Sequence, residues 1–265
     1  MAHPAYSDQG RFVWHENMTP DLEGSTFFYT RLFGWSTRTM DMGPEGPYTV
    51  FQNGGVDVGG LWKVDAAQAS RASWIAYATV PDVDTAAAAI PELGGEILTP
   101  PTDVPGVGRF AMLRDPHGAV ISPFRFGGDA PPMPAGSYPV GSVCWNELVV
   151  PEPDEAVPFY TAVFGWTARR RDLPGIGEYR VLQQDGMDAA GVRRPPEGAP
   201  CPAGWMMYIR VDDVDRTANL AAELGGRVMS PPLDIDGIGR YAVLTDPSGG
   251  VFAVLKPNGQ KRDKA

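Results

Sequence analysis

Short apolar segments follow one another along the chain, and glycine or proline separates most of them. Residues 12–18 are predicted as a strand. In residues 21–33, by contrast, Leu22, Phe28 and Leu32 recur at helical spacing, and Gly34 follows as the residue type that commonly ends a helix. The chain therefore begins with a predicted strand and a predicted helix.

The rest of the first half predicts further strands and one more helix. Residues 82–93 are rich in alanine, and Gly94 and Gly95 close this predicted helix. Turn residues bound the other segments, so we predict strands at residues 48–52, 56–62, 73–80, 97–98, 109–113 and 120–124. The order is strand, helix and then two or three strands, and it occurs twice.

The second half of the chain repeats the first at a constant shift of 131 residues. The matched segments include Trp14-His15-Glu16 with Trp145-Asn146-Glu147, Phe28-Tyr29-Thr30 with Phe159-Tyr160-Thr161, and Asp115-Pro116-His117-Gly118 with Asp246-Pro247-Ser248-Gly249. A gapless match of this length indicates a duplicated domain. The predicted organisation is a tail (1–10), a first domain (11–127), a Pro/Gly-rich linker (128–140), a second domain (141–257) and a second tail (258–265).

Composition excludes several classes of protein. Hydrophobic residues make up 43% of the chain and charged residues 20%, as in a globular protein with a core. No apolar run approaches the roughly 18–20 residues that cross a bilayer, and the N-terminus lacks the pattern of a secretory signal. A net charge of −10 without a basic patch argues against a nucleic-acid partner. Cys144 and Cys201 are too few for a disulfide framework or a zinc cage, so we expect a reduced, cytoplasmic protein without a membrane partner.

Four motifs, in the same order in both halves, resemble the vicinal oxygen chelate superfamily, which includes glyoxalase I, the bleomycin-resistance proteins and the extradiol dioxygenases. They are the Phe28–Trp35 end of the first helix, the Asp82-Val83-Asp84 start of the second, the Leu93-Gly94-Gly95 stop and the Asp-Pro-x-Gly turn. The resemblance implies an α+β fold of tandem domains, each built of two βαβββ units whose curved sheets surround a ligand cleft. The Trp-x-Glu start is similar to a tandem branch common among actinobacterial proteins labelled glyoxalase or hydroxylase.

The resemblance also implies where a metal ion would be held in metal-using members. The positions of the histidine ligands fall on Trp14, Ile75, Trp145 and Met206, and those of the glutamate ligands fall on or near Ser122, Ala253, Gly60 and Gly191. None of these is a strong metal ligand. Independently, a 2-His-1-carboxylate site needs two converging imidazoles, but the chain has only His3 in a tail, His15 on a strand and His117 in a turn. The second half has no histidine, so a symmetric metal site in both halves cannot be built. We therefore expect no metal ion and no other cofactor.

The candidate catalytic residues are Glu16 and Glu147. Alternate residues of a strand share a face, so Glu16 lies beside Trp14, and Glu147 lies beside Trp145. A carboxylate next to an indole in a partly dry cleft would have a raised pKa and would serve as a general base or ligand anchor. The alternative is a structural glutamate that accepts from a backbone amide or pairs with an arginine to hold the sheets together.

Further polar and aromatic residues on strands are candidates for ligand binding. Tyrosine and glutamine tips suit orientation of a carbonyl or hydroxyl group, indoles suit stacking, and methionine makes a pocket wall adaptable. The candidates are Trp14, Tyr48, Gln52, Trp62, Trp145, Tyr179, Gln183 and Met206, with Trp74 and Trp205 as further strand tryptophans. The alternative for each is core packing or mutual hydrogen bonding.

Three charged residues carry separate hypotheses. Arg109 and Arg240 each follow a Gly-x-Gly segment and are expected to pair with Asp115, Asp246 or a glutamate, or else to clamp an anion. His15 is expected to be a buried or rim histidine rather than a base.

These observations favour a metal-free protein that binds a small apolar or aromatic molecule and either sequesters it or acts on it in tailoring or detoxification. If it is an enzyme, a lyase, isomerase or hydroxylase type is expected. The competing hypothesis is a metal-dependent glyoxalase-type lyase or dioxygenase. A protein-interaction module is a third class, and either a monomer or a homodimer is compatible with tandem copies.

Overall fold

The structure is a computed structural model that describes residues 9–43, 46–65, 71–129, 138–198 and 203–258. His3, Cys201 and most of the predicted linker and tails lie outside the described residues. The first repeat contains β1 (Phe12–Thr19), α1 (Leu22–Phe33), β2 (Ser36–Asp41), β3 (Pro47–Asn53), β4 (Val56–Lys63), β5 (Ser73–Thr79), α2 (Val83–Ala89), β6 (Glu96–Val104), β7 (Gly108–Arg114) and β8 (Val120–Phe126).

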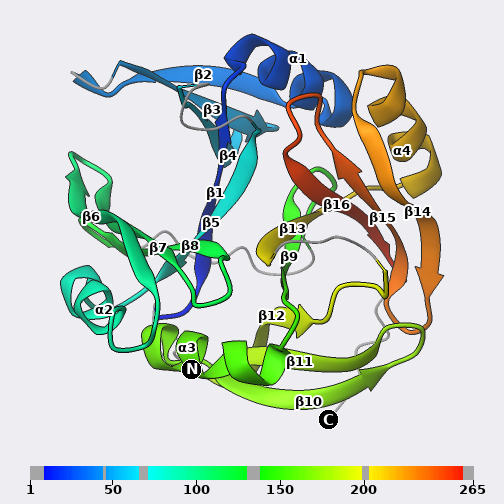
Figure 1. Cartoon of the computed structure of the whole chain (residues 1–265). Helices are drawn as coiled ribbons and strands as arrows, with labels where there is room; N and C mark the ends of the chain where they lie inside the picture. The colour runs from blue at the N-terminus through cyan, green and yellow to red at the C-terminus, as the bar shows by residue number, and fades with distance from the viewer. Residues whose placement is uncertain (1–8, 44–45, 66–70, 130–137, 199–202, 259–265) are drawn as a thin grey trace, which may run out of the picture. The chain divides into compact units, whose positions relative to one another are not determined.

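The second repeat has the same order of elements (Figure 1). It contains β9 (Val143–Val149), α3 (Pro153–Phe164), β10 (Thr167–Leu173), β11 (Gly177–Gln184), β12 (Met187–Arg193), β13 (Gly204–Arg210), α4 (Val214–Glu223), β14 (Arg227–Ile235), β15 (Gly239–Thr245) and β16 (Val251–Pro257). The βαβββ pattern therefore occurs four times, and the predicted α+β class is confirmed.

Each repeat forms a mixed sheet of eight strands. The order is β2-β3-β4-β1-β5-β8-β7-β6 in the first sheet and β10-β11-β12-β9-β13-β16-β15-β14 in the second. The parallel pairs are β1 with β4, β5 with β8, β12 with β9, and β13 with β16. None of the helices among the described residues is long and apolar enough to cross a membrane.

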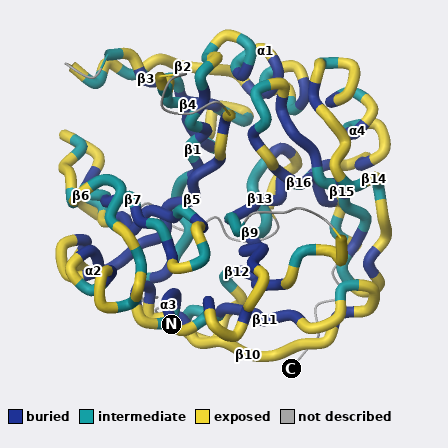
Figure 2. The backbone as a smooth tube through the Cα atoms, viewed as in Figure 1, coloured by how far each residue is buried: buried dark blue, intermediate teal, exposed yellow. Residues whose placement is uncertain are grey.

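The structure differs from the predicted elements in three places. The strand predicted at residues 97–98 is longer, because β6 runs over Glu96–Val104. The strand β2 was not predicted, because its residues are almost all exposed and show no apolar alternation (Figure 2). The second helix ends at Ala89 rather than at residue 93. Pro91 explains this early end, since a proline has no N–H to donate and its ring clashes with the carbonyl four residues earlier. In the second repeat, where Ala222 replaces the proline, the matching helix runs to Glu223.

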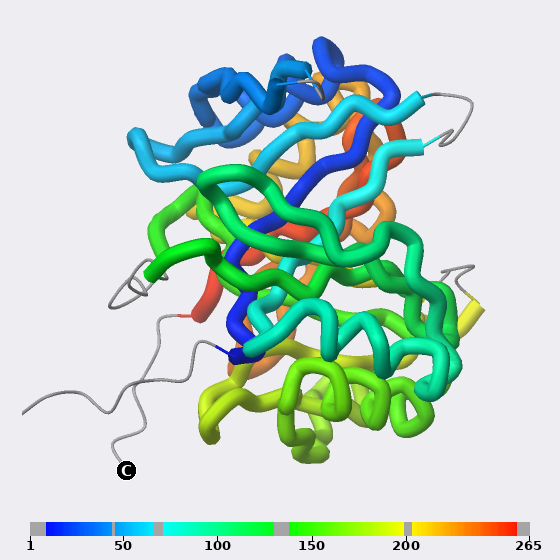
Figure 3. Tube along the Cα trace, turned by 90° about the vertical axis from the view of Figure 1, so that its left-hand side faces the viewer, coloured from blue at the N-terminus to red at the C-terminus, as the bar shows by residue number. Residues whose placement is uncertain are grey.

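The described chain divides into two compact units that exchange halves of the repeats. Among the described residues, unit 1 contains 75–129, 145–198 and 203–206, and unit 2 contains 15–43, 46–65, 71–74 and 207–258, each with a short additional segment. In unit 1, α2 packs beside α3, and the second half of the first repeat lies along the first half of the second repeat (Figures 1 and 3). In unit 2, α1 packs beside α4 (Figure 1). The predicted domains (11–127 and 141–257) describe the sequence repeat, whereas packing follows these exchanged halves.

A buried hydrogen-bond chain joins the two halves within unit 2. The indole of Trp74 donates to the hydroxyl of Tyr29 (2.8 Å), which donates to Asp246 (2.8 Å). Asp246 also accepts from the backbone of Gly250 in its own turn (2.8 Å). The Phe-Tyr motif and the Asp-Pro-x-Gly turn, which come from different repeats, therefore meet in one core.

Unit 1 contains the matching chain. Trp205 donates to Tyr160 (3.1 Å), and Tyr160 donates to Asp115 (2.8 Å). The hypothesis that Trp74 and Trp205 line a cleft is wrong, because both indoles are buried in the cores of their units and are held by these tyrosines.

The first testable prediction concerns the charge on Asp246. Burial raises the pKa of this carboxyl above its ordinary value of 3.8. The folded state therefore keeps the proton to a higher pH than the unfolded state does, and the stability contributed by Asp246 falls as pH rises through the folded pKa. We expect the difference in unfolding free energy between the wild type and Asp246→Asn to move in favour of the variant as pH rises from about 4 to 7. Urea denaturation across this range measures the difference, and a shift in favour of the wild type would contradict the assignment.

The arginines after the Gly-x-Gly segments are structural, but their expected partners were wrong. Arg109 pairs with Asp84 and Asp103, both exposed, rather than with Asp115. Arg240 pairs with Asp215 and Asp234 in the same way. The carboxylates of the Asp-Pro-x-Gly turns are instead occupied by backbone amides and by the buried tyrosines.

Candidate functional site

A candidate site lies on one sheet face of unit 1. The strand β9 places Trp145 and Glu147 two residues apart, so both side chains leave the same face. The parallel strand β12 places Gly191 opposite Glu147, with Arg193 two residues further on. The antiparallel strand β11 then places Tyr179 opposite Arg193. Four side chains from three strands therefore converge.

These side chains form one hydrogen-bonded network. Trp145 Nε1 donates to Tyr179 Oη (3.0 Å), and Tyr179 Oη donates to Glu147 Oε1 (2.9 Å). Arg193 Nε donates to Glu147 Oε2 (2.7 Å). Only 4% of the Glu147 side chain and 10% of the Arg193 side chain are exposed, so this is a buried ion pair. Of the candidates for ligand binding, the structure thus brings Trp145, Tyr179 and the candidate base Glu147 together.

The environment keeps the Tyr179 hydroxyl protonated. Burial is the main cause that raises its pKa well above the ordinary value of 10.0, and the charge of Glu147 raises it further. Tyr179 therefore acts as a hydrogen-bond donor. The contacts of Glu147 match the alternative in which the glutamate pairs with an arginine. For Glu147 to act as a base, its ion pair with Arg193 would first have to break.

Glycine is required opposite the tyrosine. A Cβ atom added at Gly191 would lie 1.6 Å from the Tyr179 hydroxyl oxygen, and one added at Gly60 would lie 1.8 Å from that of Tyr48. In both repeats the tyrosine hydroxyl occupies the space where a side chain at this position would begin. No side chain at this position is compatible with the tyrosine as it stands.

The second prediction follows from this contact. Gly191→Ala is expected to displace Tyr179 and to lower the free energy of unfolding by about 1–3 kcal/mol, the usual cost of overpacking. Gly128→Ala is the control, because a Cβ atom there meets open space. Chemical denaturation measures both variants, and equal stability of the two would contradict the described contact.

The first repeat has partly different residues at the positions that match this network. Glu16 lies opposite Gly60 in the parallel pair of β1 and β4, and its side chain is half-buried. Where Arg193 stands in the second repeat, the first has Trp62, whose ring centroid lies 5.9 Å from that of Tyr48. An indole cannot form an ion pair, so the pair of Glu147 with Arg193 has no counterpart between Glu16 and Trp62.

Gln52 and Gln183 lie in a separate polar cluster of each repeat. Gln52 donates to Asp57 (2.8 Å), which also pairs with Arg38. Gln183 donates to Asp188 (2.8 Å), which pairs with Arg169 in the same way. These arginines and aspartates were missed by the sequence analysis. The constant shift of 131 residues matches them in pairs and is the signal that would have found them.

The remaining candidates lie apart from this network. Trp14 is half-buried in unit 1, and His15 is buried in unit 2, as expected of a buried or rim histidine. Met206 is buried in unit 1. Burial raises the pKa of the Cys144 thiol to about 12, which leaves it protonated at neutral pH.

The positions at which the resemblance places metal ligands do not fit a metal ion. Gly60 and Gly191 face tyrosine hydroxyls, and Ser122 is buried and donates to the backbone oxygen of Ala111 (2.6 Å). The other positions carry indole, thioether or alkyl side chains. Within the described part of the chain, no group of three or more histidine, cysteine, aspartate or glutamate residues is arranged to hold a metal ion.

Two sequence profiles match the chain, one in each repeat. The profile described as "Glyoxalase/Bleomycin resistance protein/Dioxygenase superfamily" matches residues 11–122, and the one described as "Glyoxalase-like domain" matches residues 142–255. Among curated proteins, "Putative glyoxylase CFP32" of Mycobacterium bovis is 34% identical over 96% of this chain and 97% of its own length. "Anthracycline biosynthesis protein DnrV" of Streptomyces peucetius is 31% identical over 93% of both chains.

Solved structures show the same fold at low sequence identity. A Mn(II)-bound glyoxalase from Novosphingobium aromaticivorans superposes with a TM-score of 0.59 at 16% identity, over 95% of this chain and 82% of that one. The 2,3-dioxygenase LapB from Pseudomonas superposes with a TM-score of 0.62 at 17% identity, over 98% and 97%. With the four βαβββ units and the two matched profiles, these comparisons show that the chain belongs to the vicinal oxygen chelate superfamily of glyoxalases, bleomycin-resistance proteins and dioxygenases, with two domains in tandem.

Proposed function

We propose that this protein binds a small apolar or aromatic molecule on the sheet face of Trp145 and Tyr179, without a resident metal ion. It either sequesters this molecule or acts on it as a tailoring or detoxification enzyme of the lyase, isomerase or hydroxylase type. One observation carries the proposal. Trp145 and Gly191 stand at positions where the resemblance places metal ligands, and the Tyr179 hydroxyl lies against Gly191. With Glu147 and Arg193, Trp145 and Tyr179 offer an indole face and hydrogen-bonding groups there instead.

The same contacts suggest what each side chain of the site would do in catalysis. Tyr179 keeps its proton and is held by Glu147, so it and Trp145 are suited to orienting a bound ring. At the matching place of the first repeat, the half-buried Glu16 is the candidate general base of a separate site, in which Tyr48 would take the orienting role. Tyr48 lies on β3, and its ring contacts Gly60 and Trp62 of the neighbouring strand β4.

The relatives support this choice of ligand. A relative named for anthracycline biosynthesis covers nearly the whole chain, which favours a polycyclic aromatic molecule as the ligand class. The glyoxylase-named relative favours an enzyme of the same superfamily.

Titration of the purified full chain with polyketide-like and flavin-like aromatics tests the proposal, with tryptophan fluorescence as the readout. We expect saturable quenching by at least one of them. Trp145→Leu should weaken its binding by about tenfold, because an aromatic contact contributes roughly 0.5–1.5 kcal/mol beyond its buried area. Phe27→Leu is the control, because Phe27 is 56% exposed on α1. Indifference to the whole panel would contradict the proposal.

The competing function is a metal-dependent glyoxalase-type lyase or dioxygenase. Elemental analysis of purified protein for Zn, Ni, Fe and Mn separates the two. The proposal expects no stoichiometric metal. Near-stoichiometric metal that is lost in His15→Ala or Glu16→Ala would favour the metal-dependent enzyme.

A further inference from the structure

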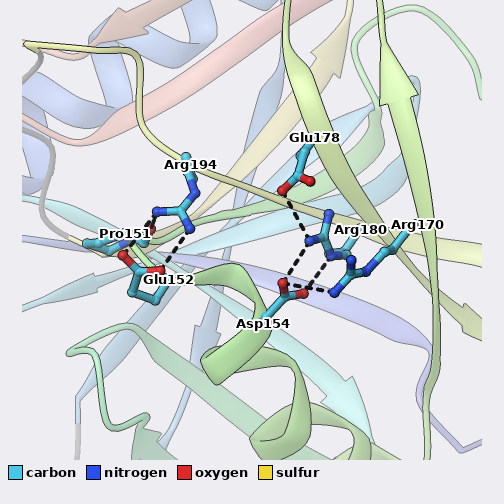
Figure 4. A network of polar contacts seen from close by, with 7 residues as sticks. All are labelled: Pro151, Glu152, Asp154, Arg170, Glu178, Arg180 and Arg194. Atoms are coloured by element: carbon cyan, nitrogen blue, oxygen red, sulfur yellow. Dashed lines mark hydrogen bonds and ion pairs between the residues drawn. The ribbon is translucent and has the colours of Figure 1, made fainter.

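Arg171 shares a sheet face with Tyr179. The two residues are directly opposite in the pairing of β10 with β11, so their side chains leave the same side of the sheet. The neighbouring pair, Arg170 and Arg180, leaves the other side. Both of its members bind Asp154 in the first turn of α3 (Figure 4). Arg171 and Tyr179 therefore lie on the face turned away from α3, together with the candidate site.

Arg171 is the arginine on this face that lacks a carboxylate partner. Arg169 pairs with Asp188, and Arg193 pairs with Glu147. Arg171 is exposed and makes no side-chain hydrogen bond or ion pair with the residues that the structure describes. Three arginines thus face two carboxylates, which leaves one positive charge, and that charge is on Arg171.

On the matching face of the first repeat, carboxylates outnumber arginines. Met40 stands at the position of Arg171 and lies opposite Tyr48, and Trp62 stands at the position of Arg193. The ion pair of Arg38 and Asp57 remains. With Glu16, the described residues of β1 to β4 place two carboxylates and one arginine on this face. The two repeats therefore keep the tyrosine and the glutamate but differ by two positive charges around them.

We propose that the β9–β12 face binds an aromatic molecule that carries a carboxylate, and that Arg171 determines this specificity. The guanidinium group of Arg171 contacts the carboxylate in a two-pronged pair, the geometry in which arginine binds carboxylates best. The half-buried indole of Trp145 meets the ring. The inference rests on the proposed function, because it names the ligand class of that site.

A matched pair of probes tests the inference on the full chain. Anthraquinone-2-carboxylate and anthraquinone-2-carboxamide have the same ring system and differ in charge. Isothermal titration calorimetry at low ionic strength should show that the wild type binds the carboxylate about fivefold more tightly, and added salt should reduce this preference. If both probes bind equally, the inference is overturned and the proposed function stands. If neither binds, the inference is overturned, and the fluorescence titration with the whole aromatic panel decides the proposed function.

Two variants on neighbouring residues locate the effect. Arg171→Met introduces the residue of the first repeat and should abolish the preference for the carboxylate while the affinity for the carboxamide stays unchanged. Arg170→Met removes the same charge one residue away on the α3 face and should keep the preference. An equal loss in both variants would show general electrostatic attraction instead of a contact with Arg171, and would overturn the inference.

Discussion

Replacing Arg193 by methionine is expected to lower the free energy of unfolding by about 3–5 kcal/mol, the usual result of removing one partner of a buried ion pair. The loss is large because Glu147 stays behind. Its side chain is almost fully buried, and the hydrogen bond from the Tyr179 hydroxyl does not replace the charge of the guanidinium group. Urea denaturation measures the change.

A second substitution separates the ion pair from general packing. In the double variant Glu147→Gln/Arg193→Met, the amide oxygen of the new glutamine still accepts from Tyr179, and no buried charge remains. Most of the lost stability should therefore return. If the double variant is less stable than Arg193→Met alone, the effect does not come from an unpaired carboxylate, and the described ion pair is contradicted.

Asp115→Ala is expected to lower the free energy of unfolding by about 3 kcal/mol or more, because each buried donor left without an acceptor costs about 1–3 kcal/mol. The carboxylate of Asp115 accepts from the backbone amides of His117 and Ala119 (2.9 and 2.7 Å) and from Tyr160. The substitution leaves all three donors without this acceptor.

The control is Asp84→Ala, which removes an exposed carboxylate of the same unit that is paired with Arg109. Its unfolding midpoint should stay close to that of the wild type, since surface ion pairs add little stability. Equal losses for the two variants would mean that the turn does not join the two halves of unit 1.

The sequence repeat predicted the fold well because the motifs that carry it are local. A helix that ends in Phe-Gly-Trp and a turn with Asp-Pro-x-Gly can be identified without knowing what they contact. The strand β2 escaped prediction because an exposed edge strand does not need apolar alternation. The exchange of halves between the repeats could not be predicted either. Nothing in the order of residues says that Tyr29 meets Asp246 rather than Asp115.

The candidate site was only partly predictable for a related reason. Comparison of the two repeats points to what they share, such as Trp145, Glu147 and Tyr179. Arg193 and Arg171 are positions at which the repeats differ, because the first repeat has Trp62 and Met40 there, so the residues that the repeats share do not include them. The charge that distinguishes the two faces becomes visible only when the strand register shows which side chains leave which side.

Binding of an aromatic ligand to protein freed of metal by a chelator shows whether the site works without a metal ion. The full chain is dialysed against EDTA and titrated with anthraquinone-2-carboxylate by calorimetry. We expect the ligand to bind with the same affinity before and after chelation. Binding that disappears with EDTA and returns with one equivalent of a divalent metal ion would contradict it, as would the absence of binding in both samples.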